Sequence, residues 1–252
     1  MTESIITTSS AGSPDPSGRR ATAISIIVPV LNEAELIRSC LTNLRRCAPK
    51  AEIIVVDGGS SDGTYELAVE LSDQCVVSAR CGRAAQMNEG ARIARGEIFW
   101  FLHVDAEVPP FCLDEIRSAL RRPEFVGGFF RVRIPKSSFV YRLTDGFAHY
   151  AGIVLRMRCG DHGMFCRRDV FVRIGGFPDV PVMEDVEFFR RLHRIGKIGR
   201  IKKHLIVSAR RYELVGPVRL TLAYGFIAIL YAVGMPWPIL ASLYSRFCQF
   251  RE

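Results

Sequence analysis

Short runs of apolar, mostly β-branched or aromatic residues alternate with helix-like segments along the first part of this chain. The clearest are ISIIVPV at 24–30, IIVV at 53–56 and IFWFL at 98–102. Runs of this kind are typical of strands buried on both faces of a parallel sheet. Between them, apolar residues recur at the spacing of one helix face, as Leu36 and Cys40 do. The rhythm predicts an α/β domain with a mostly parallel central sheet flanked by helices.

Polar and acidic residues follow three of these runs. Asn32 and Glu33 come after the first, Asp57 ends the second, and Asp105 and Glu107 come after the third. In an open parallel sheet, ligands bind outside the carboxyl ends of the strands. We therefore expect these five side chains to converge on one binding site.

Helix caps and turns are the alternative explanation for single polar residues at such places. Asn32, with Glu35 three residues later, has the pattern of a capping box. Glu184 and Asp185 open a predicted helix, whose dipole they would complement. Caps alone explain three converging strand ends poorly, so we favour a binding site.

Composition and motifs narrow the function classes. The chain has 252 residues, 48% of them hydrophobic, which excludes a disordered chain. No G-x-G-x-x-G follows the first strand, and no G-x-x-x-x-G-K-[ST] loop occurs, so a dinucleotide fingerprint is not supported and a P-loop is excluded. The eight cysteines include no C-x-x-C pair, which argues against a zinc site and for reduced thiols in a cytosolic protein.

The formal net charge of +8 is concentrated towards the C-terminus. Ten Lys or Arg and one acid lie between Arg190 and Arg219. Such a stretch favours an anionic partner or surface. The following run, 220–245, has no charge, and its core at 220–235 has 16 residues, fewer than the ~20 of a spanning helix.

These features divide the chain into three parts. Residues 1–22 are rich in Ser, Thr, Gly and Pro without a signal-peptide core, which predicts a disordered tail. We expect the α/β domain over 23–215. We expect 216–252 to form an apolar helical segment that docks on the domain or lies at a membrane interface.

The ordered set of motifs resembles a family-2 glycosyltransferase with the GT-A fold, over roughly residues 24 to 210. The matching pieces are ISIIVPVLNE at 24–33, VVDGGSSDGT at 55–64, DAE at 105–107, GGF at 175–177 and MED at 183–185. Four further segments are similar to a bacterial subgroup named for its genomic association with radical-SAM/selenodomain proteins: GRAAQMNEGA at 82–91, FLHVDAE at 101–107, GDHGMF at 160–165 and SARRYE at 208–213.

The resemblance implies a nucleotide-sugar donor, for which we expect a UDP-sugar, and a divalent cation, Mg²⁺ or Mn²⁺, at its diphosphate. The donor-binding residues implied are Pro29, Asn32, Glu33, Asp57, Arg83 and Asp105. Asp105 and Glu107 match the family's D-x-D metal motif, with Glu in place of the second Asp. His103 and His204 are left out, because a lone histidine is more often a surface or core residue.

The resemblance also implies an inverting transfer. Asp185 matches the family's catalytic base, which takes a proton from the acceptor hydroxyl, and Glu184 would orient it. Asp161 and His162 match the acceptor-side loop. The Q-x-x-R-W signature of processive synthases is absent, so we expect the transfer of a single sugar.

The apolar C-terminal stretch and its basic flank suggest a lipid-linked acceptor and an anionic membrane surface, at the cytoplasmic inner face of the cell membrane. We expect no nucleic-acid partner. Two alternatives remain. A nucleotidyltransferase-like enzyme would carry a Gly-rich basic loop where this chain has VLNE at 30–33. A non-catalytic basic binding module would not need its acids at the strand ends.

Overall fold

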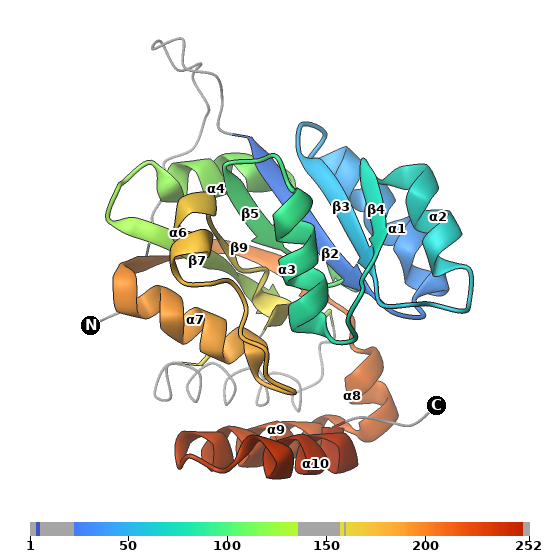
Figure 1. The fold of residues 1–252 in the computed structure, drawn as a ribbon, viewed down its shortest axis with the longest axis vertical. Coiled ribbons are helices and arrows are strands. Elements are labelled where there is room, and N and C mark those ends of the chain that lie inside the picture. Colours follow the sequence, from blue (N-terminus) through green and yellow to red (C-terminus); the bar gives the residue numbers. More distant parts are fainter. Residues whose placement is uncertain (1–3, 6–22, 136–156, 159, 249–252) are drawn as a thin grey trace.

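A single mixed sheet forms the centre of the molecule in the computed structural model, which describes residues 4–5, 23–135, 157–158 and 160–248 (Figure 1). Its nine strands have the order β1-β9-β7-β8-β5-β2-β3-β4, with β6 paired to β9. Five of its strand pairings are parallel and three antiparallel, which confirms the mostly parallel sheet. The strands are β1 (Ser4–Ile5), β2 (Ile24–Val30), β3 (Glu52–Asp57), β4 (Gln74–Val77), β5 (Ile98–Phe101), β6 (Ala106–Glu107), β7 (Phe125–Arg133), β8 (Phe165–Arg167) and β9 (Lys197–Val207).

The three apolar runs form β2, β3 and β5, as predicted, and their side chains alternate between two cores. Ile26 and Val28 belong to one core, and Ile27 between them belongs to the other. Because both faces are buried, nearly every residue of the run is apolar. Helices α1 (Ala34–Cys47), α2 (Thr64–Leu71) and α4 (Cys112–Leu120) cover the first face, and α3 (Arg83–Ile93), α6 (Arg168–Arg173) and α7 (Glu184–Ile195) the second (Figure 1).

Parallel pairing brings the carboxyl ends of the strands together. Val30 pairs with Asp57 at the ends of β2 and β3, and Asp57 pairs in turn with Val77 of β4. β5 lies on the other side of β2. The loops that leave these strands therefore start side by side.

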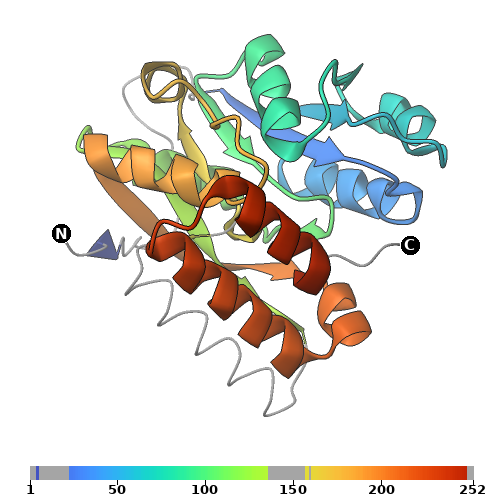
Figure 2. The ribbon, with the colours of Figure 1, turned by 60° about the horizontal axis from the view of Figure 1, so that its bottom comes forward.

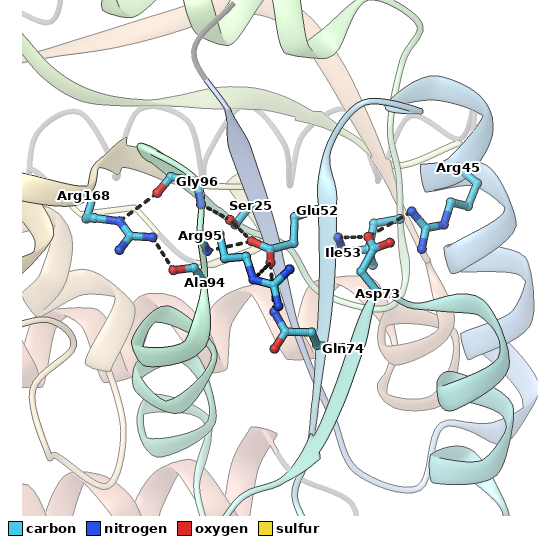
Figure 3. Close-up of polar contacts among 10 residues, drawn as sticks. All are labelled: Ser25, Arg45, Glu52, Ile53, Asp73, Gln74, Ala94, Arg95, Gly96 and Arg168. Atoms are coloured by element: carbon cyan, nitrogen blue, oxygen red, sulfur yellow. Dashed lines mark hydrogen bonds and ion pairs between the residues drawn. The ribbon is translucent and has the colours of Figure 1, made fainter.

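A polar network lies at the opposite end of these strands, where their amino ends meet (Figure 3). The buried Ser25 hydroxyl donates to Glu52 and accepts the backbone N–H of Gly96 at 2.8 Å. Glu52 also accepts the backbone N–H of Arg95 and the side-chain amide of Gln74, each at 2.8 Å. This network fixes the amino ends of β2, β3 and β4, away from the loops that carry the acids.

Three helices follow the sheet: α8 (Arg210–Val215), α9 (Pro217–Ala232) and α10 (Trp237–Cys248). α9 and α10 lie side by side below the sheet and next to α7 (Figures 1 and 2). Leu220, Ile227 and Leu240 pack in a third apolar core with Val182 and Val186. None of the helices in the described part of the chain is long and apolar enough to cross a membrane.

Of the tail expected over 1–22, the structure describes only Ser4–Ile5, which form β1 at the edge of the sheet beside β9. The rest of that segment lies outside the described residues.

Candidate active site

Asp57 ends β3 with one carboxylate oxygen bound and the other available. The residue is buried, and its Oδ1 accepts the backbone N–H groups of Gly59 and Ser60, each at 2.7 Å. Its Oδ2 is also buried but has no hydrogen-bond partner among the described residues. An unsatisfied buried acceptor costs free energy, so this oxygen is suited to receive a hydrogen bond from a ligand.

Asn32 joins the loop after β2 to the loop after β3. Its backbone lies in the left-handed region, with φ of 50°. Its N–H donates to Ser60 Oγ at 2.9 Å, and its Oδ1 accepts the N–H of Ser61 at 3.0 Å. Asn32 therefore lies beside the Asp57 loop, as expected for residues of one site.

The start of α1 corrects one sequence-based prediction. The N-cap residue is Glu33, whose side chain makes no capping bond. Thr64 Oγ1 instead accepts the N–H of Glu33 at 2.8 Å, and Asp62 Oδ2 accepts the N–H of Ala34 at 3.0 Å. The prediction that Asn32 opens a capping box is wrong, because the oxygens that cap α1 come from the loop after β3 and from the first residue of α2.

Helix α3 contributes Gln86, which the sequence analysis missed. Its buried amide donates to the backbone carbonyls of Val30 at 2.7 Å and Val56 at 2.9 Å. One turn earlier, Arg83 Nη1 lies 3.7 Å from Glu184 Oε1. α3 thus connects the strand ends to the start of α7. The signal that could have identified Gln86 is its spacing, because it lies four residues before Gly90 and so on the same, buried side of α3.

Asp185 lies at the start of α7 with its carboxylate buried. Its Oδ2 accepts the N–H of Gly160 at 2.6 Å, and its Oδ1 accepts the N–H of Val186 at 2.7 Å. Burial, and next the charge of Glu184, raise the pKa of Asp185 to about 7, against the opposing effects of Arg83 and the two N–H groups. The structure therefore places a carboxylate that titrates near neutral pH at this point.

His103 lies in the same group, although the sequence analysis left it out. Its Nδ1 is 3.3 Å from Asp161 Oδ1. A Cβ atom added at Gly160 would meet His103 Nε2 at 2.4 Å and Asp185 Oδ2 at 3.5 Å. The imidazole, the short helix η1 (Gly160–His162) and Asp185 are therefore immediate neighbours. His162 Nδ1 is 3.0 Å from the carbonyl oxygen of Phe130 on β7.

A family model described as "Glycosyl transferase family 2" matches residues 25–176, more than half of the chain. The chain belongs to this family. Membership sets it apart from the nucleotidyltransferases, one of the two alternatives raised by the sequence.

Two family relatives show how far the likeness extends. Glycosyltransferase AglE of Haloferax volcanii is 30% identical over 170 residues, which are 62% of this chain and 56% of AglE. The PGL/p-HBAD biosynthesis glycosyltransferase of Mycobacterium tuberculosis is 26% identical over 168 residues, 62% of this chain and 64% of that protein. The chain thus spans less than two thirds of the length of either relative.

Solved structures confirm the GT-A fold. The mannosyltransferase PcManGT of Pyrobaculum calidifontis, in complex with GDP-Man and Mn²⁺, has a TM-score of 0.64 at 23% identity, covering 92% of this chain and 71% of that one. Glucosyl-3-phosphoglycerate synthase of Mycobacterium tuberculosis, in complex with Mn²⁺, UDP and glucosyl-3-phosphoglycerate, has a TM-score of 0.59 at 19% identity, covering 85% of this chain and 81% of that one.

The remaining residues expected on the donor side lie on and beside β2. Pro29 is half-buried in β2, opposite Val56 of β3. Glu33 forms an ion pair with Arg210 of α8, with the Arg210 Nη2 atom 3.2 Å from Glu33 Oε2. α8 is thereby held over the start of α1, and Arg210 brings a positive charge to this end of the sheet.

The two acids that match the family's D-x-D motif differ in exposure. Asp105 is half-buried in the turn between β5 and β6. Glu107 is exposed on β6, opposite Ile206 of β9, and lines a surface hollow of about 890 Å³ with Lys50 and His204. That hollow shares none of its lining residues with the group around Asp57 and Asp185.

The described side chains supply few ligands for a metal ion on their own. No group of three or more His, Cys, Asp or Glu in the described ranges is placed to hold an ion. Mg²⁺ is commonly held by one or two carboxylates together with substrate phosphates. The half-buried carboxylate of Asp105 fits that manner of binding.

Proposed function

We propose that this chain transfers a single sugar from a nucleotide-diphosphate-sugar donor to an acceptor hydroxyl, with inversion and with a divalent cation, and without processive extension. The observation that carries the proposal is Asp185, a buried carboxylate with a pKa near 7 at the carboxyl end of the sheet of a family-2 chain. A general base works best when its pKa lies near the working pH.

Asp185 is proposed as the base that accepts the proton of the acceptor hydroxyl as its oxygen attacks the anomeric carbon. The N–H groups of Gly160 and Val186 hold the carboxylate in one orientation. Glu184 pairs with Arg83 and keeps that arginine beside the base. The negative charge of Glu184 raises the basicity of Asp185.

The donor would bind across the ends of β2 and β3. The available Oδ2 of Asp57 would accept an N–H of the nucleobase, and Pro29, Asn32 and Glu33 would line the pocket around it. Arg83 would approach the diphosphate. We propose a UDP-sugar as donor. The glucosyl-3-phosphoglycerate synthase complex supports UDP, whereas the PcManGT complex contains GDP-Man, so both nucleotides belong in the test.

A divalent cation, Mg²⁺ or Mn²⁺, would be held by Asp105 and the donor phosphates, with Glu107 as the second protein ligand that the motif implies. Both structural relatives contain Mn²⁺. When bound, such an ion neutralises the charge that develops on the leaving diphosphate.

The acceptor is proposed to approach from the side of η1, where Asp161 and His162 lie near His103. We propose a lipid-linked acceptor, reached at the cytoplasmic face of the cell membrane. Helix α9 supports this part of the proposal, because it packs next to α7 and exposes apolar residues on its other side.

A thermal-shift experiment tests the donor site. Wild-type protein is heated with UDP-, GDP-, dTDP- and CMP-sugars, each with Mn²⁺ or with EDTA. We expect a Mn²⁺-dependent rise in Tm with a UDP-sugar, because a ligand that binds only the folded state stabilises it. Asp57→Asn turns an acceptor into a donor at Oδ2 and should remove the rise.

Asp169→Asn is the matched control, because Asp169 lies on the exposed surface of α6. It should leave the rise unchanged. No rise with any donor in the wild type, or an equal rise in Asp57→Asn, would contradict the proposed donor site.

A further inference from the structure

Helix α9 and its C-cap residue expose a stripe of large apolar residues on the side opposite the buried residues of the helix. Its members are 49% to 72% exposed and recur at helical spacing: Val218, Leu222, Phe226, Ile229 and Val233. Phe247 of α10 extends the stripe, because it lines a hollow of about 310 Å³ with Arg219, Leu222 and Phe226. We call these six apolar residues the outer face.

The opposite side of α9 is fully used by the fold. Leu220, Ile227 and Tyr231 are buried against α7 and α10. The helix is therefore apolar around most of its circumference, a pattern expected of helices covered on all sides. Within the described part of the chain, the outer face is not buried.

Charge distinguishes between possible partners of this face. The only charged residues of α9 and α10 are Arg219 and Arg246, and no acid occurs in the sequence over 214–251. In a contact between two copies of the outer face, neither copy would offer an acid of α9 or α10 to pair with Arg219 or Arg246. An anionic surface would instead match both arginines.

Length excludes the alternative of a spanning helix. α9 has 16 residues and is about 24 Å long at 1.5 Å per residue, shorter than the ~30 Å hydrocarbon core of a bilayer. Its exposed apolar face, rather than its length, suits α9 to lie in the plane of the interface.

We infer that the outer face of α9 and α10 docks on an anionic lipid bilayer. Contacts behind the face connect it to the site. The Tyr231 hydroxyl donates to Glu187 and accepts from Arg190 Nη1, both on α7. Docking would thus hold α7, and Asp185 at its start, at a fixed height above the bilayer. This link to catalysis rests on the proposed function, whereas the docking itself does not.

Vesicle co-sedimentation tests the docking. Full-length protein is spun with phosphatidylcholine vesicles that contain or lack phosphatidylglycerol. We expect binding that is stronger with phosphatidylglycerol and weaker at high salt. Leu222→Ser with Phe226→Ser should lower the partition coefficient about tenfold or more, since two inserted side chains are lost.

Two further variants make the result specific. Arg219→Gln with Arg246→Gln should remove the preference for phosphatidylglycerol. Val172→Ser changes a residue of α6 that is 70% exposed, and should bind vesicles as the wild type does. Circular dichroism melting checks that each variant is folded.

Three results would overturn the inference: no binding by the wild type, unchanged binding by the Leu222/Phe226 variant, or a dimer in ultracentrifugation that the same variant dissociates. None of these readouts uses a sugar donor, so failure here is distinct from failure of the proposed transferase site.

Discussion

Three features of its surroundings act on the carboxyl group of Asp185: burial, a neighbouring acid and two backbone N–H donors. Burial and Glu184 disfavour its charge, and the N–H groups and Arg83 favour it. The first pair prevails, so its pKa lies near 7 rather than near the usual ~3.9 of an aspartate. The energetic cost of the buried charge is what makes the group a proton acceptor at neutral pH.

This raised pKa makes stability depend on pH in a defined direction. Between about pH 4 and pH 7, folded Asp185 keeps a proton that the unfolded chain releases, so its contribution to stability is lost as pH rises through the folded pKa. Asp185→Asn has no such loss. The Tm of Asp185→Asn minus that of the wild type should therefore become more positive from pH 5 to pH 8, by at least ~2 °C, the effect of about 1 kcal/mol in a domain of this size. A difference that stays constant across this range would refute the raised pKa.

At the scale of elements, the main feature near Asp57 is that residues following β3 cap the start of α1. α1 takes its capping oxygens from Asp62, in the loop that precedes α2, and from Thr64, at the start of α2, so the loops after β2 and β3 are fixed together around Asp57. Thr64 is central, since its fully buried hydroxyl accepts the N–H of Glu33 and donates to Asp62.

Thr64→Val keeps the shape of this side chain and removes the hydroxyl. We expect a loss of about 1–2 kcal/mol in the free energy of unfolding, typical of a lost cap, and weaker donor binding. Urea denaturation measures the first effect. Thr42→Val, at an exposed position of α1, is the matched control and should change stability by less than ~0.5 kcal/mol. Equal stability of the two variants would show that the cross-cap contributes nothing.

Sequence patterns predicted the helices and strands better than they predicted which distant segments contact one another. β2, β3 and β5 follow from local periodicity, because burial on both faces leaves a mark in each run. The cap of α1 does not follow from local periodicity. Its oxygens come from Asp62 and Thr64, which lie beyond the next strand of the chain. His103 was left out for a similar reason: its neighbours Gly160 and Asp161 come from a distant segment, and a lone histidine carries no spacing signal.

At the scale of the whole molecule, the two ends of the sheet differ in purpose. At the amino ends of the strands, the Ser25–Glu52 network pairs polar groups with one another (Figure 3). At the other end, Asp57 Oδ2 has no hydrogen-bond partner among the described residues, and burial and the charge of Glu184 raise the pKa of Asp185. The C-terminal helices then place an apolar, positively charged surface beside α7. The family resemblance pointed to Asp57 and Asp185, whose roles stay predictions, whereas the exposed position of Glu107 depends on how β6 pairs with β9.

Asp185 is proposed to act on the acceptor hydroxyl and not to bind the donor. The decisive measurement compares wild type and Asp185→Asn in two assays: donor affinity, and transfer of radiolabelled sugar from that donor to a lipid extract. We predict that transfer falls by about 10²–10⁴-fold, the usual contribution of a general base, while donor Kd stays within about threefold. Transfer that persists within tenfold, or donor affinity that falls together with transfer, would contradict the assignment of Asp185 as the base.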